Sequence, residues 1–228
     1  MLESPPTLWD ERYQHAVVSF QGKIWVIGGQ TIDQGSGGLR NDLWHTDSDD
    51  GSLWRFLGGD ATSEDSECLP ARRGHAATVD PSNTMIMLFG GLSNTGGGDV
   101  YLNDVWFYNY SVSSDGKPTQ CGNSCWRRLT ANAPWKGRYL HSSLVYQNSV
   151  WIVGGQYEAA PRQPTHLGDV WVSDGKEVNA TAVGEKWNEA LDGEGATARW
   201  NKRSGHAMVV HDTRGILALK SKCTERSL

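Results

Sequence analysis

The chain has 228 residues and a formal net charge of −5 at pH 7, and its basic residues are scattered, which excludes the clustered positive surface of a nucleic-acid-binding domain. It holds no run of 18 apolar residues, and Met1 to Asp10 lack the charged start and apolar centre of a signal peptide, so we expect no membrane insertion and no secretory leader. Its 27 glycines and 11 tryptophans punctuate short β-branched runs without helical periodicity, which predicts an all-β fold.

One apolar stretch closed by two glycines occurs three times along the chain. The copies end at Gly28-Gly29, Gly90-Gly91 and Gly154-Gly155, at steps of 62 and 64 residues. An apolar run that ends in a glycine pair predicts a buried strand followed by a turn that needs positive φ or close backbone approach. Self-similarity at this period indicates a repeat architecture and outweighs any single-residue motif.

The residues on either side of each glycine pair repeat as well. An arginine and a histidine precede the run: Arg12/His15, Arg73/His75, Arg138/His141 and, at the start of a fourth unit, Arg203/His206. An aspartate, an apolar residue and a tryptophan follow it: Asp42-Leu43-Trp44, Asp104-Val105-Trp106 and Asp169-Val170-Trp171. An Asp-Gly pair and a last tryptophan complete the units, at Trp54, Trp126 and Trp187.

In chain order, each unit resolves into four predicted strands, a to d. Strand a covers His15 to Phe20, His75 to Val79, His141 to Tyr146 and His206 to His211, and strand b is the glycine-pair run. Strand c covers Leu43 to Thr46, Val105 to Tyr108 and Val170 to Ser173, and an Asp-Gly turn folds strand d back onto it. Such a meander has two apolar faces and must stack on a like neighbour. The tryptophans of strands b and c suit that layer, so we expect Trp151→Ala to unfold the array locally.

Together, an Arg-x-x-His pair, an apolar run with Gly-Gly, an Asn-Asp-apolar-Trp segment and a separate Trp resemble the kelch repeat. The resemblance spans about residues 9 to 188 and implies a β-propeller, in which each meander is one blade around a central channel. It implies a remnant of a preceding blade over 1–11, blades over 12–57, 72–129 and 138–190, and a truncated fourth blade with a divergent tail over 199–228. Because four to eight blades close a propeller, we expect an open one, whose further blades would come from a longer chain or another subunit.

The repeated residues are expected to be structural. His15, His75, His141 and His206 occupy one place in every unit, as do the arginines, and no helix follows the glycine pairs to bind an anion. We expect Asp42, Asp104 and Asp169 to accept backbone hydrogen bonds where strand c begins. No Gly-x-Ser-x-Gly elbow, Walker loop or metal-ligand spacing is present, so we predict no catalytic residue, no metal ligand and no cofactor.

The compartment is not specified by the sequence. Cys121 and Cys125 enclose three residues, a gap that fits a small hoop disulfide in an oxidising compartment. The glycosylation sequons Asn109-Tyr110-Ser111 and Asn179-Ala180-Thr181 also fit a secretory or extracellular location.

Function is expected where the units differ. The b–c loops and the d–a connectors share one face of the predicted propeller and are long: Gln30 to Arg40, Leu92 to Leu102, Gln156 to Leu167, Gly58 to Pro70, Thr130 to Gly137 and Ala190 to Lys202. Long irregular loops on a rigid scaffold commonly form binding sites. The candidate contacts there are loop aromatics without counterparts in the other units, with two arginines: Tyr101, Trp135, Tyr157, Trp200, Arg40 and Arg162. An interpretation of equal weight is that the aromatics pack locally and pin the loops.

The kelch resemblance, together with these long loops, implies a binding module for a protein partner. A galactose-oxidase-like copper enzyme is the alternative from another class, since that kind of enzyme shares kelch repeats. It would need a Tyr-Cys pair and two metal histidines at the channel mouth, whereas His45, His166 and His211 are isolated in the sequence. The loop aromatics leave a carbohydrate-binding or sugar-modifying propeller as a third interpretation.

Overall fold

The computed structural model describes residues 9–32, 38–48, 51–59, 68–94, 96–109, 126–173, 186–191, 201–211 and 215–219. Every regular element in these ranges is a β-strand, and a search of them for a helix long and apolar enough to cross a membrane finds none. Several predicted features lie outside the described residues: Trp200, Cys121, Cys125, most of the two sequons and the tail after Leu219.

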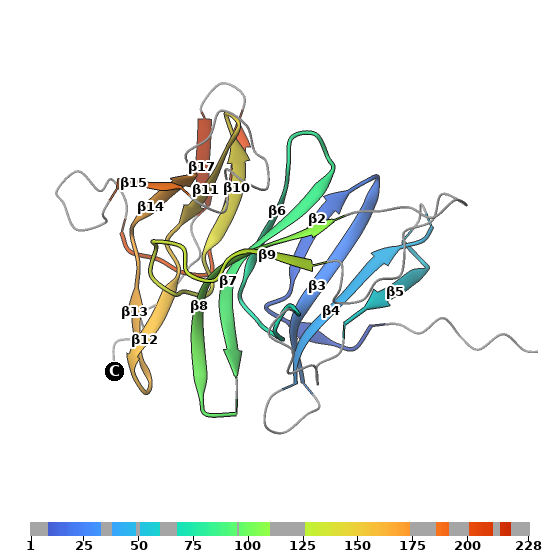
Figure 1. Cartoon of the computed structure of the whole chain (residues 1–228), viewed down its shortest axis with the longest axis horizontal. Helices are drawn as coiled ribbons and strands as arrows, with labels where there is room; N and C mark the ends of the chain where they lie inside the picture. Colours follow the sequence, from blue (N-terminus) through green and yellow to red (C-terminus); the bar gives the residue numbers. More distant parts are fainter. Residues whose placement is uncertain are drawn as a thin grey trace, which may run out of the picture.

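Three antiparallel sheets, each built on four main strands, dominate the chain (Figure 1). Blade 1 consists of β2 (Ala16–Phe20), β3 (Lys23–Thr31), β4 (Leu39–Thr46) and β5 (Trp54–Gly58), with the short β1 (Arg12–Tyr13) added to β3. Blade 2 consists of β6 (Ala76–Val79), β7 (Met85–Asn94), β8 (Asp99–Asn109) and β9 (Trp126–Thr130). Blade 3 consists of β10 (Ser142–Tyr146), β11 (Ser149–Val153), β14 (Val170–Ser173) and β15 (Trp187–Leu191). The predicted all-β fold and the four-stranded meander are confirmed.

Two smaller sheets complete the architecture. β16 (Ala207–His211) and β17 (Gly215–Leu219) form an antiparallel pair next to β10 of blade 3. β12 (Gln156–Ala160) and β13 (Gln163–His166) form a hairpin inserted between β11 and β14.

The segments 92–102 and 156–167, which the sequence predicted to be irregular loops, are β-hairpins. In blade 2 the ladder between β7 and β8 shifts register at the glycine pair and then continues to the partners Asn94 and Asp99. In blade 3 pairing resumes between Gln156 and His166. In blade 2 the prediction was wrong because a bulge at the glycine pair bends β7 and β8 without ending them. In blade 3 β11 ends before the glycine pair and the chain pairs again as a separate hairpin, so the backbone groups of both segments stay hydrogen-bonded beyond the blade.

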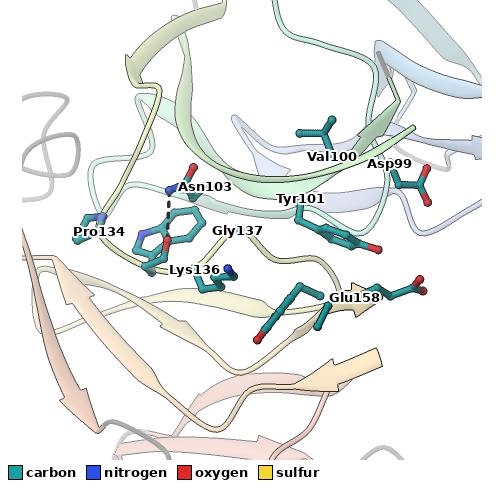
Figure 2. Close-up of a pocket in the computed structure, with 11 residues that line it drawn as sticks. Asp99, Val100, Tyr101, Asn103, Pro134, Lys136, Gly137 and Glu158 are labelled. Atoms are coloured by element: carbon teal, nitrogen blue, oxygen red, sulfur yellow. Dashed lines mark hydrogen bonds between the residues drawn. The ribbon is translucent and has the colours of Figure 1, made fainter. Parts of the chain in front are cut away.

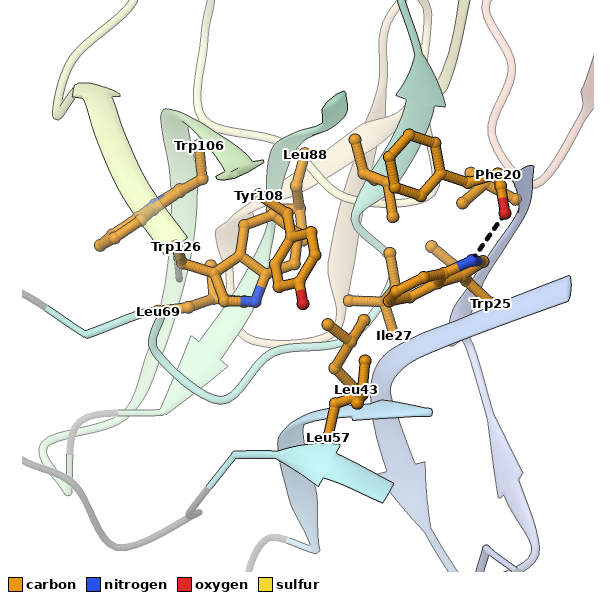
Figure 3. Packing of buried hydrophobic residues seen from close by; sticks show 13 residues of the cluster. Phe20, Trp25, Ile27, Leu43, Leu57, Leu69, Leu88, Trp106, Tyr108 and Trp126 are labelled. Carbon is orange, nitrogen blue, oxygen red and sulfur yellow. Dashed lines mark hydrogen bonds between the residues drawn. The ribbon is translucent and has the colours of Figure 1, made fainter. Parts of the chain in front are cut away.

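The hydrophobic core lies between the blades. Trp25 and Ile27 of β3 and Trp106 and Tyr108 of β8 belong to one core, in which the rings of Trp25 and Tyr108 lie 5.6 Å apart between centroids (Figure 3). Ile86 and Leu88 of β7 belong to the same core. Met87 and Phe89 alternate with them along β7, point to the opposite face and join the core shared with blade 3. Blade 2 therefore buries its two apolar faces against two different neighbours, blade 1 and blade 3.

Part of the outer face of blade 1 is apolar and exposed. Val17, Ile24 and Phe56 on that face are 52%, 49% and 42% exposed. Ile24 stands four residues before Gly28, and Ile86 stands four residues before Gly90 but is fully buried under blade 1. The same blade face is thus covered in blade 2 and open in blade 1, and the described blades form an open array.

Candidate functional site

One buried polar cluster recurs in all three blades. In blade 3 the guanidinium of Arg138 donates to both carboxylate oxygens of Asp169, at 2.7 and 2.6 Å, and to the Gly154 carbonyl at 2.8 Å. The indole Nε1 of Trp171 donates to the same carboxylate at 2.8 Å. The equivalent sets are Arg12–Asp42–Trp44 in blade 1 and Arg72–Asp104–Trp106 in blade 2. Each buried charge has its counter-ion and its hydrogen bonds, which is the condition for a stable buried ion pair.

The cluster corrects two predictions. The framework arginine of blade 2 is Arg72, which is fully buried, and not Arg73, whose guanidinium reaches Gln30 Oε1 at 2.5 Å instead. The framework arginine stands three residues before its histidine, whereas Arg73 stands two before it, and in extended chain neighbouring side chains point to opposite sides. The strand-c aspartates accept from side-chain donors and not from backbone N–H groups, because a buried guanidinium needs their charge.

The glycine pairs make room for the histidines. Gly90 and Gly91 have φ of +52° and +106°, and a Cβ at Gly90 would come within 3.2 Å of His141 Cε1. Burial, with a smaller contribution from Arg72, lowers the pKa of His75 to about 3, and burial with Arg203 lowers that of His206 to about 4. Neutral imidazoles that are buried between blades suit a structural role. We propose that the four histidines have this role.

Unrepeated side chains gather in a cleft of about 850 Å³ between blades 2 and 3. The start of β8, the connector from β9 to β10 and strand β12 supply its walls (Figure 2). The lining residues are Asp99, Val100, Tyr101, Asn103, Pro134, Trp135, Lys136, Gly137, Tyr157, Glu158 and Ala159. In Figure 1 the tips of the β7–β8 and β12–β13 hairpins point to the same edge of the molecule, so this edge is the face that carries the b–c segments.

The connector wall is held tightly against β8. Asn103 Nδ2 donates to the carbonyls of Ala133 and Trp135, at 2.8 and 3.3 Å. A Cβ on Gly137 would collide with the Tyr101 carbonyl oxygen, so only glycine allows this approach. Asn41 binds the Leu69 carbonyl in the same way in blade 1. The asparagine of the Asn-Asp-apolar-Trp segment therefore anchors the d–a connector, a role that sequence reasoning missed although the residue stands in the motif.

Tyrosines and charged groups form the rest of the cleft. The Tyr101 ring packs on Tyr139 with centroids 5.5 Å apart. Burial, followed by the nearby Glu158 carboxylate, raises the pKa of Tyr101 to about 12, so its hydroxyl remains protonated and able to donate. Lys136 Nζ lies 4.8 Å from the centroid of the Tyr157 ring, a cation–π contact between the connector and the hairpin.

The predicted contact residues fall in different places. Tyr101 and Tyr157 line the cleft. Trp135 lines it too but is only 1% exposed, and its ring packs on Trp187 with centroids 6.2 Å apart, so it also belongs to the core. Arg162 is exposed at the turn of the β12–β13 hairpin. Arg40 is not among the residues that line the cleft.

Arg40 belongs to blade 1, where its guanidinium pairs with Asp10 at 3.1 Å. Sequence reasoning missed three charged residues of the cleft, Asp99, Lys136 and Glu158. Each stands within two residues of a predicted aromatic contact, and this proximity was the available signal.

The copper-oxidase interpretation gains no support from the described part of the chain. His45 is fully buried, its ring lies 5.0 Å from that of Trp25, and its Nδ1 is 2.7 Å from the Thr46 carbonyl oxygen. Among the described residues, no group of three or more His, Cys, Asp and Glu side chains is arranged to hold a metal ion.

A family model described as the KLHDC2/KLHL20/DRC7 Kelch-repeats domain matches residues 14–219. No curated protein sequence gives a significant match to the chain. The matched span runs from β2 through β17 and so includes the three blades and the β16–β17 pair. Propeller modules of this kind are typically used to bind other proteins. The chain therefore belongs to the kelch-repeat family.

Proposed function

We propose that this kelch module binds a protein partner through the cleft between blades 2 and 3. The observation that carries the proposal is the location of the unrepeated side chains: Tyr101, Lys136, Tyr157 and Glu158 share one hollow on the hairpin face. Its volume of about 850 Å³ is within the range of ligand-binding clefts. Tyrosine offers a rigid apolar ring together with a polar tip, which is why it is enriched in binding hot spots.

The cleft is already shaped by the chain itself. Asn103 fixes the connector by two hydrogen bonds, and Gly137 brings it against β8. The β12 wall is held to the connector by Lys136 and Tyr157. A preformed cleft loses less conformational entropy on binding than a mobile loop would, so more of the contact energy contributes to affinity.

Photo-crosslinking from the cleft tests this function. A photoreactive phenylalanine analogue replaces Ala159, an exposed lining residue, in the otherwise unchanged chain. We expect a specific protein adduct, identified by mass spectrometry from cell extract, and we expect Tyr157→Ala to reduce its yield about tenfold, because an interface tyrosine commonly contributes more than 1 kcal/mol. Thermal unfolding should show Tyr157→Ala still folded, since its side chain is only half-buried.

Two controls separate binding at the cleft from general stickiness. The same photoreactive residue at Glu189, exposed on β15, should not give the adduct. Tyr13→Ala removes a 41% exposed tyrosine that does not line the cleft, and the adduct yield should be unchanged. Equal adducts from positions 159 and 189, or equal losses with Tyr13→Ala and Tyr157→Ala, would rule out the cleft as the binding site.

We also propose that a further kelch blade covers the outer face of blade 1. Ile24 is 49% exposed there, while its counterpart Ile86 is buried by the preceding blade. An exposed apolar sheet face of this kind indicates an interaction surface. The double variant Ile24→Lys/Phe56→Lys should bind less of a hydrophobic fluorescent dye than the wild type while its unfolding midpoint stays the same. Equal dye binding by both proteins would contradict the proposal.

The sugar-binding alternative has less support than a protein partner. Sugar-binding sites use open aromatic faces, whereas the Tyr101 ring is packed on Tyr139 and the Tyr157 ring faces Lys136. No described residue favours the copper enzyme.

A further inference from the structure

Two carboxylates lie at one end of the cleft. Asp99 and Glu158 line the cleft itself and also an adjoining hollow of about 350 Å³. In Figure 2 their carboxylates lie at the same end of the cleft, with the Tyr101 hydroxyl between them. The adjoining hollow is lined by Asp99, Tyr101, Glu158, Ala159, Ala160 and Pro161. We name this region the acidic end of the cleft.

The negative charge of the acidic end is not balanced locally. Within the described part of the chain, neither Asp99 nor Glu158 makes an ion pair, and Glu158 Oε2 accepts only the backbone N–H of Arg162, at 3.1 Å. Lys136 is the one cationic residue that lines the cleft, and its ammonium group lies over the Tyr157 ring. A carboxylate has about four lone-pair sites, so both groups keep capacity for further donors.

The negative charge of the acidic end also affects the pKa of Tyr101. Burial is the main cause of its raised pKa, and the carboxylates of Glu158 and Asp99 contribute to it. The hydroxyl therefore stays neutral, and its oxygen offers another acceptor beside the two carboxylates.

Trp135 gives an independent indication of a ligand in the adjoining part of the cleft. Its side chain is 1% exposed and lines the cleft, and its Nε1 finds no acceptor among the described residues. A buried donor left without an acceptor costs roughly 1 to 3 kcal/mol. This Nε1 atom is shielded from solvent, so a carbonyl oxygen of a peptide segment seated in the cleft reaches it only when the Trp135 ring turns toward the cleft.

We propose that the acidic end receives a lysine or arginine side chain from the peptide segment that occupies the cleft. This inference rests on the proposed function and adds the chemistry of the partner. The positive head binds between Asp99 and Glu158, and the methylene stem lies along the apolar rim of Ala159, Ala160 and Pro161. The contact between Lys136 and Tyr157 shows that this cleft already holds an ammonium group against a tyrosine ring.

The test is a selection from a random peptide library displayed on phage, with the whole chain as bait. We expect enriched peptides to carry lysine or arginine at one fixed position. The affinity of an enriched peptide should fall about fivefold in Glu158→Gln and in Asp99→Asn, as expected for a partly exposed charge pair. Both substitutions keep the side-chain shape and remove the charge, and neither carboxylate has an ion partner among described residues, so the fold should be unaffected.

A matched variant controls for net charge. Glu189→Gln removes an exposed carboxylate on β15, outside the cleft, and should leave the peptide affinity unchanged. Replacing the selected basic residue of the peptide by norleucine, which keeps the stem and removes the charge, should weaken wild type about fivefold and Glu158→Gln much less.

The possible results separate this inference from the proposed function. Enriched peptides that depend on Tyr157 but show no basic position would overturn the inference and leave the cleft as the binding site. Peptides that bind equally well to Tyr157→Ala, or a library that yields none, would overturn both.

Discussion

The repeated framework and the cleft both contain charged and aromatic side chains, but these side chains are paired with one another in the framework and line a hollow in the cleft. In the framework, an arginine, an aspartate and a tryptophan meet with nearly the same hydrogen-bond lengths in every blade. In the cleft, Tyr101, Lys136 and Glu158 occur once each and keep exposed polar atoms. The difference shows that in a repeat protein periodicity, and not residue type, separates the charges that stabilise the blades from the charges that line the cleft.

The largest effect is expected at a framework arginine. Arg138 is fully buried, so Arg138→Ala strands the Asp169 carboxylate and removes the donors to Gly154 and Lys136. Breaking a buried pair in this way costs about 3 to 5 kcal/mol. Urea unfolding monitored by tryptophan fluorescence should give a loss of that size or no folded protein.

An exposed ion pair provides the matched control. Arg55 and Asp47 lie 2.6 Å apart, but their side chains are 37% and 34% exposed. Arg55→Ala should cost less than about 1 kcal/mol, since solvent screens such pairs. Similar losses for Arg55→Ala and Arg138→Ala would show that the framework pair is not special.

The second effect compares two tryptophans of strand b. Trp25 is fully buried between blades 1 and 2, whereas Trp151 of blade 3 is half-buried. Trp25→Ala should lower the free energy of unfolding in urea by about 3 to 5 kcal/mol. Trp151→Ala should lower it clearly less, because the Trp151 side chain buries less apolar area on folding. The larger loss for Trp151→Ala would mean that the blade interfaces are not the main source of stability.

The third effect is an acid sensitivity of the framework. Because the pKa of His75 falls from 6.5 to about 3 in the folded chain, the unfolded chain binds a proton first as the pH drops below about 6.5. Stability is therefore complete at neutral pH and is lost on acidification, by about 2 kcal/mol at pH 5 for this histidine. His75→Gln should lower stability at pH 7 but flatten the decline from pH 7 to pH 5. An unchanged slope would show that another group titrates.

Sequence periodicity predicted the fold because the blade core repeats. Most strands of blades 1 to 3 begin and end near the expected residues, since the apolar runs and the glycine pairs are set by packing between blades. The exceptions are β4 and β8, which begin at Leu39 and Asp99 and not at the expected Leu43 and Val105. The error at Arg73 arose from counting the wrong one of two adjacent arginines, which a strict three-residue spacing to the histidine corrects.

The cleft could be predicted only in part. Tyr101 and Tyr157 were found because they break the repeat, but Asp99 and Glu158 carry no periodic signal and are brought together by two hairpins about 60 residues apart in sequence. Trp135 broke the repeat as well, yet it is buried against Trp187. A sequence shows which residues differ between units, whereas only the pairing of the strands shows which of them meet.

The smallest change in stability with a large change in binding is expected at Gly137. A Cβ there collides with the Tyr101 carbonyl oxygen, so Gly137→Ala must push the connector away from β8, at a cost of about 1 to 3 kcal/mol for overpacking. Lys136 and Trp135 move with it, and crosslinking from position 159 should fall even in protein that is still folded. Gly97→Ala is the matched control, because nothing lies within 4 Å of its added methyl group. If Gly137→Ala lowered stability but left crosslinking unchanged, the connector would belong to the framework and the β8 and β12 walls alone would form the binding site.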